Sequence, residues 1–205
     1  AVIPDSPFLD EHLLSDPCFN SLSYDKYLNK SYCIKLYGEN NKNKKLSLDY
    51  VSWLVKLLNI RKKVYIDIWP SEVKKDFINK IIGPQDVNSG STDRVTINIW
   101  RAEELPKVMI HEIVHLSHNH FYPGPNADNY IRERFNIQGK ISSVEGFTEW
   151  LAIILHSVFV SNKLTRSSAL VEQILYNEYL FNLVQCCRLL RHYGYNSWDD
   201  LVIKK

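Results

Sequence analysis

The spacing of apolar side chains along the chain predicts helices. Leu48 to Leu58 repeats apolar residues at three- and four-residue steps behind a capping Ser47. Glu103 to Ser117 is apolar on most sides and tolerates Pro106 only in its first turn. Two further long helices are predicted, one capped by Ser142 and Ser143 and running to about Val160, the other from Ser167 to Tyr193.

Alternating residues rich in β-formers predict two strands, at residues 63–69 and 94–100. Pro70 is expected to end the first strand, and an amphipathic helix is expected over residues 71–81. Residues 83–93 are rich in turn formers, so we expect them to form the connection to the second strand.

The remaining segments lack a regular apolar repeat. Residues 1–25 contain three prolines and are expected to form an irregular arm over the body, and the basic stretch 38–45 is expected to be a surface loop. One short helix is predicted at 128–135. Another is expected to open at Ser197, with Asp200 completing a pair that resembles a capping box.

This order of elements predicts a single α+β domain, which suits a chain of 205 residues. We divide it into an arm and loop (1–46), an α/β part (47–120) and a helical part (121–205). The sequence contains no internal repeat.

Composition excludes several classes of protein. Apolar residues make up 45% and charged residues 23%, as in globular rather than disordered or fibrous chains. The net charge of +2 is too small to indicate nucleic-acid binding. Apolar runs such as Leu151–Leu155 are far shorter than the roughly 20 residues of a membrane span, so no membrane span is expected.

Because the chain begins at Ala1 without Met, we expect a processed or trimmed product, and its compartment is left open.

The cysteines do not indicate a metal or redox motif, because none of them forms a C-x-x-C pair. Cys18 and Cys33 are compatible either with a disulfide or with free thiols. The other two cysteines are Cys186 and Cys187.

His111, Glu112 and His115 form the pattern H-E-x-x-H on the predicted helix 103–117. Residues four apart project from one helix face, so two imidazoles can bind one metal ion while Glu112 lies beside them. The alternative, two histidines and a glutamate in the core, would bury a carboxylate without a partner at a cost of several kcal/mol. We therefore expect His111 and His115 to be metal ligands.

A catalytic zinc needs a third protein ligand and an open position. His118 follows His115 by three residues, but a third ligand from the same helix would crowd the ion, so we expect it at the surface or beside the ligands. Glu145, near the start of the next long helix, is the better candidate. Glu149, one turn on, is expected either to accept a ring N–H from a ligand histidine, to be an ordinary surface residue, or to replace Glu145 as ligand.

The stretch His111-Glu112-Ile113-Val114-His115, followed by Glu145-Gly146-Phe147, resembles the gluzincin branch of zinc metallopeptidases, where a second helix donates a glutamate. The resemblance implies a zincin-like α+β fold with a small N-terminal sheet, an active-site helix and a helical C-terminal part, holding one Zn²⁺. Gly146 would let the two helices approach closely. The resemblance also implies an oxyanion-stabilising side chain from the C-terminal helices, for which we expect Tyr193 and then His192, although both could simply end a helix.

Such a site predicts hydrolysis of peptide bonds in a protein or peptide substrate. Zinc would lower the pKa of its bound water, and Glu112 would act as general base. The strand 94–100 is expected to be an edge that pairs with the substrate backbone, whereas Trp69, Trp100 and Trp150 are expected in the core.

Two alternatives stay open: an exopeptidase with the same site, and a non-catalytic binding or structural protein on the same scaffold. The sequence does not indicate an oligomeric state.

Overall fold

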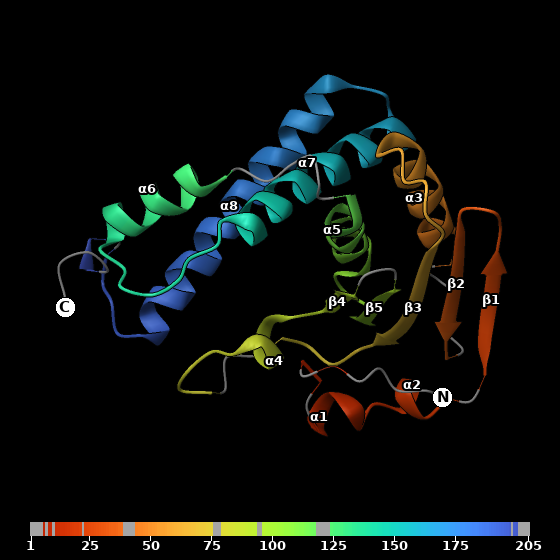
Figure 1. Ribbon diagram of the computed structural model, residues 1–205, viewed down its shortest axis with the longest axis horizontal. Coiled ribbons are helices and arrows are strands. Elements are labelled where there is room, and N and C mark those ends of the chain that lie inside the picture. Colours follow the sequence, from red (N-terminus) through yellow and green to blue (C-terminus); the bar gives the residue numbers. More distant parts are fainter. Residues whose placement is uncertain are drawn as a thin grey trace. The chain divides into compact units, whose positions relative to one another are not determined.

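The computed structural model describes residues 6, 8–9, 11–21, 23–38, 44–75, 79–93, 96–117, 124–197 and 199–200 (Figure 1). Eight helices and five strands lie within these ranges, so the predicted mixed α+β class is confirmed. Contacts between Cα atoms divide the chain into two compact units, Ala1–His118 and Asn119–Lys205.

The first unit contains one five-stranded sheet, in the order β1-β2-β3-β5-β4. Its three central strands are parallel, and the strands at both edges are antiparallel to their neighbours. The strands are β1 (Tyr24–Leu28), β2 (Tyr32–Tyr37), β3 (Val64–Ser71), β4 (Gly90–Asp93) and β5 (Thr96–Arg101). The two predicted strands correspond to β3 and to the described part of 94–100 in β5, whereas β1, β2 and β4 were not predicted.

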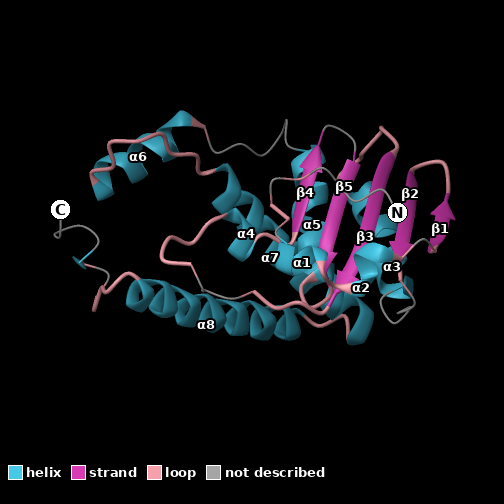
Figure 2. Ribbon diagram, turned by 90° about the horizontal axis from the view of Figure 1, so that it is seen from below, coloured by secondary structure: helices cyan, strands magenta, loops and turns pink. Residues whose placement is uncertain are grey.

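One face of the sheet packs against two helices, α3 (Lys44–Leu57) and α5 (Leu105–Ser117) (Figure 2). Both helices were predicted from their apolar spacing. Ser47 lies inside α3 and is buried, so its predicted role as the cap is wrong. The sheet residues of this core are at most 2% exposed: Ile34, Leu36, Ile66, Ile68, Ile97 and Ile99.

The N-terminal arm covers part of the opposite face. It is not wholly irregular, since it contains two short helices, α1 (Glu11–Leu14) and α2 (Pro17–Asn20), ahead of β1. Phe19 of α2 stacks on Trp69 at 6.0 Å between ring centroids, and Tyr37 stacks on the same indole at 4.6 Å. Trp69 and Trp100 are buried in this cluster, as predicted. Cys18 and Cys33 are free thiols.

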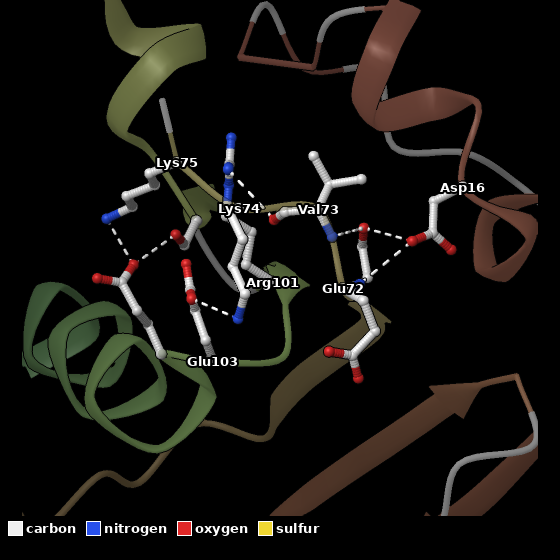
Figure 3. Close-up of polar contacts among 10 residues, drawn as sticks. Asp16, Glu72, Val73, Lys74, Lys75, Arg101 and Glu103 are labelled. Atoms are coloured by element: carbon white, nitrogen blue, oxygen red, sulfur yellow. Dashed lines mark hydrogen bonds and ion pairs between the residues drawn. The ribbon is translucent and has the colours of Figure 1, made fainter. Parts of the chain in front are cut away.

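Asp16 anchors the arm to the end of β3 (Figure 3). Its side chain accepts hydrogen bonds from the backbone N–H of Cys18 at 2.9 Å, from Ser71 Oγ at 2.7 Å and from the backbone N–H of Glu72 at 3.2 Å. Burial by itself raises the pKa of Asp16, but these hydrogen bonds outweigh burial and hold the pKa below its ordinary value.

The helix predicted over 71–81 is wrong wherever the structure describes it; residues 76–78 lie outside the described residues. Pro70 does not end β3, because the register with β5 shifts between Ile68 and Ser71, where a missing N–H is tolerated. After Ser71 the chain stays non-helical, and the guanidinium of buried Arg101 donates to the carbonyl oxygens of Val73 and Gln85 at 3.4 and 3.3 Å. The backbone is thus held by side chains rather than by helical hydrogen bonds.

The segment 83–93, predicted as a connection, contains the short helix α4 (Pro84–Val87) and the edge strand β4. Gly83 donates its N–H to Asp86 Oδ2 at 2.7 Å, which closes the turn before α4. The strand had no alternating apolar residues by which the sequence could indicate it.

The second unit is helical in its described part: α6 (Pro125–Phe135), α7 (Val144–Leu164) and α8 (Ser168–His192), all predicted with shifted ends. α8 packs on α7 as the second arm of a helical hairpin (Figure 1). Trp150 is 57% exposed, so its predicted place in the core is wrong. At the end of the unit, Asp200 Oδ2 accepts the N–H of Ser197 and Ser197 Oγ accepts that of Asp200, so the predicted capping pair is confirmed.

One described helix, α7, is long and apolar enough by length and composition alone to cross a membrane. A third of that stretch is buried, and core helices of soluble proteins meet the same criteria. The described residues therefore contain no clear membrane span.

Candidate metal centre

The two histidines of the H-E-x-x-H pattern lie on the same side of α5. His111 and His115 are each half-buried, and their Nε2 atoms lie 3.0 Å apart. The ring centroids are 4.8 Å apart, with the ring planes at 71°. The four-residue spacing on a helix thus brings the two imidazoles together.

The distance between these nitrogens is close to what a tetrahedral ion requires. With zinc–nitrogen distances of about 2.0–2.1 Å, two ligating nitrogens stand about 3.3 Å apart. The observed 3.0 Å also fits a hydrogen bond in which one ring donates N–H and the other accepts. The geometry therefore fits a metal site as well as a pair of hydrogen-bonded imidazoles, and metal content distinguishes them.

Glu112 points into the protein, toward β4, and is only 7% exposed. Its Oε2 accepts a hydrogen bond from Thr92 Oγ1 at 2.5 Å, and the same hydroxyl lies 3.2 Å from the main-chain oxygen of Glu112. A buried carboxylate needs a polar partner in place of water. Thr92 is such a partner, and it comes from a strand that the sequence did not indicate.

Gly90 leaves room for this carboxylate. A Cβ at Gly90 would lie 3.0 Å from Glu112 Oε1, 2.7 Å from Val108 Cγ1 and 3.1 Å from the main-chain oxygen of Asn98. Because interiors are close-packed, a larger residue here would push α5 away from β4. The sequence analysis missed Gly90 and Thr92, since the tetrapeptide Gly-Ser-Thr-Asp has the composition of a turn.

The strand that ends the sheet beside α5 is β4. The prediction that 94–100 forms this edge is wrong, because β5 lies between β3 and β4. α5 contacts both β4 and β5. Among the described strands, β4 pairs on one side with β5, and its other side is the edge of the sheet.

Ser89 and Glu104 join the starts of β4 and α5. Ser89 Oγ donates to Glu104 Oε2 at 2.7 Å, and Lys75 Nζ lies 2.5 Å from the same oxygen (Figure 3). Burial by itself raises the pKa of Glu104, but the charge of Lys75, hydrogen bonds from Lys75 and Ser89, and the charge of Lys107 outweigh it. The pKa of Glu104 therefore lies below its ordinary value, and the ionised side chain stabilises this junction.

The predicted third ligand, Glu145, belongs to the second unit, where it lies exposed in the first turn of α7. The N-cap Ser143 makes no side-chain capping hydrogen bond, but its N–H donates to Asp128 Oδ1 of α6 at 2.7 Å. A Cβ at Gly146 would meet no atom within 4 Å, and the close approach of two helices at this glycine stays a prediction. Glu149 is half-buried one turn along α7.

The other predicted site residues lie at the end of α8 or outside the described residues. Tyr193 is the C-cap of α8 and is 43% exposed, and its ring meets that of His192 edge-on, with centroids 5.0 Å apart. Their predicted role in stabilising an oxyanion stays a prediction. His118 lies outside the described residues.

Comparison of the chain with protein-family models, with curated proteins and with solved structures gave no match.

Proposed function

We propose that this chain is a zinc-dependent peptidase of gluzincin type, with a zincin-like arrangement of its α+β fold. His111, His115 and Glu145 would hold one zinc ion, and Glu112 would act as general base. The observation that carries the proposal is the pair of imidazole nitrogens 3.0 Å apart, with a buried carboxylate between them in sequence.

The donor set suits zinc. Two ring nitrogens and one carboxylate oxygen are the ligand atoms that these three residues offer, and they are typical of catalytic sites that keep a fourth position open. When bound, zinc acts as a Lewis acid that acidifies a water molecule and polarises a carbonyl group. Glu145 takes the third position in this proposal because it is an acidic side chain at the exposed start of α7.

Glu112 has the surroundings of a positioned base. Its carboxylate would accept a proton from the attacking water at one oxygen and pass it to the nitrogen of the leaving amine. A carboxylate can do so only if it returns to the same place in every turnover, and its hydrogen bond to Thr92 favours a fixed position.

The side of β4 that faces away from β5 pairs with no other described strand and suits an extended peptide. The unpaired edge of a sheet has main-chain N–H and C=O groups that can pair with a substrate backbone irrespective of its side chains. Glu149 would orient a ligand imidazole, and Tyr193 or His192 would stabilise the oxyanion. The substrate would therefore be a protein or peptide segment bound in extended form.

The decisive experiment compares wild type with Glu112→Gln after loading with zinc. General-base catalysis contributes roughly 10²- to 10⁴-fold, so the variant should lose at least 100-fold in kcat while it retains its zinc. Glu133→Gln, on the exposed face of α6, is the matched control and should behave as wild type. Peptides blocked at both ends separate an endopeptidase, which cleaves them, from an exopeptidase, which does not.

If zinc-loaded wild type cleaves neither blocked nor unblocked peptides of a diverse library, the peptidase proposal is wrong. A Glu112→Gln protein as active as wild type would also contradict it, because the base would then be another group.

A further inference from the structure

Two residues of β4, Gly90 and Thr92, lie beside the carboxylate of Glu112. Thr92 Oγ1 donates to Oε2 at 2.5 Å, and the bare α-carbon of Gly90 faces Oε1. Residues two apart in a strand project from the same face, and Thr92 is paired with Ile97, which is fully buried on the helix side of the sheet. Gly90 and Thr92 therefore face α5 together, and Ser91 and Asp93 face the other way.

The two contacts act in different ways. The hydroxyl of Thr92 has one proton, and Oε2 of Glu112 is a closer acceptor than the main-chain oxygen, so the hydrogen bond is made chiefly to the side chain. Gly90 adds no bond, but it lets the carboxylate approach the strand closely enough to reach Thr92. A glutamate side chain has three rotatable bonds, and together these contacts restrict it to one position.

From this geometry we infer that Thr92 is a positioning residue that fixes the carboxylate of Glu112, with Gly90 making the space for it. The inference rests on the proposed function, in which Glu112 is the general base. A base displaced by about 1 Å can lose about 100-fold in rate, so a side-chain hydroxyl that touches neither the reacting atoms nor the metal would control kcat.

The test uses three variants of the full zinc-loaded chain. Thr92→Val keeps the shape but removes the hydroxyl, Thr92→Ser keeps the hydroxyl, and Thr96→Val removes a half-buried hydroxyl of β5 as the matched control. We expect Thr92→Val to lower kcat about 10- to 100-fold with KM and zinc content unchanged. Thr92→Ser and Thr96→Val should stay close to wild type. Equal kcat in Thr92→Val and Thr92→Ser would overturn the inference.

A second readout does not depend on activity. In a double-mutant cycle of Thr92→Val and Glu112→Ala, the shifts of the urea unfolding midpoint should be non-additive, since either change alone removes the same contact. Additive shifts would overturn the inference. An inactive wild type with zinc bound would contradict the proposed function, and the cycle would still decide whether Thr92 fixes the carboxylate.

Discussion

At the scale of single residues, the lack of a side chain at Gly90 allows β4 to pack closely against α5. Replacement by alanine would place a methyl group 2.7 Å from Val108 and 3.0 Å from Glu112 Oε1. We expect Gly90→Ala to lower the free energy of unfolding by about 1–3 kcal/mol, as overpacking does, measured by urea denaturation of the metal-free protein.

Gly146→Ala is the contrasting control for this prediction, because a methyl group there meets no atom within 4 Å and replaces glycine inside a helix. It should leave stability unchanged or raise it by up to about 1 kcal/mol. A Gly90→Ala protein as stable as Gly146→Ala would show that the strand and helix can separate without loss, contrary to the structure.

Glu104 gives a prediction for pH. Burial raises its folded-state pKa, but Lys75, Ser89 and Lys107 together lower that pKa below its ordinary value. Its stabilising contribution is therefore fully present above its unfolded pKa, about 4.3, and is lost as pH falls through the lower folded value. Since both side chains are partly exposed, we expect Glu104→Gln to lower the free energy of unfolding at pH 7 by about 1–2 kcal/mol.

The measurement is urea unfolding of wild type and Glu104→Gln at pH 7 and pH 3. The difference between the two proteins should shrink at the lower pH. Glu103→Gln, whose ion pair with Lys74 is more exposed, should change stability little at either pH. A difference for Glu104→Gln that is equal at both values would mean that its charge contributes nothing.

At the scale of elements, the arm is joined to the sheet through Asp16. Asp16→Ala removes the N-cap of α2 and the hydrogen bonds to Ser71 and Glu72 together. We expect a loss of about 1–3 kcal/mol in stability and faster proteolysis within residues 11–21. Glu11→Ala, at an exposed position of α1, is the control, and equal cleavage rates in the two variants would contradict the anchoring role.

Elements with a regular apolar repeat could be predicted from sequence. Elements whose backbone depends on contacts with distant side chains could not. Apolar spacing identified α3 and α5 because their apolar residues are buried against each other and the sheet. The β1–β2 hairpin had a signal that could have found it: Asn29 Oδ1 accepts the N–H groups of Ser31 and Tyr32, a turn typical of asparagine between β-rich runs.

Two element predictions failed because side chains distant in sequence decided the backbone. The helix expected at Ser71 is absent from the described part of 71–81, where Asp16 and Arg101 take up backbone groups that a helix would use. The strand β4 has no apolar alternation, and its place depends on Gly90 fitting against α5. Neither contact can be found from periodicity, since its partners lie on different elements.

At the scale of the whole molecule, the candidate site divides into what is local in sequence and what is not. His111 and His115 could be paired from sequence because four residues make about one helical turn, and the structure places their nitrogens 3.0 Å apart. The contact between Thr92 and Glu112 could not be predicted, because the two residues are 20 apart in sequence and Thr92 lies on a strand whose composition is typical of a turn. Glu145 belongs to the second unit, so its share in the site is a matter for experiment.

Zinc content of the purified full chain tests the central claim most directly. After dialysis against metal-free buffer, wild type and the exposed control Glu172→Gln should each retain one zinc ion per chain. His111→Gln and Glu145→Gln should retain far less, since each removes a ligand. A wild-type chain that holds no zinc, or a loss of zinc in Glu149→Gln but not in Glu145→Gln, would contradict the proposed centre.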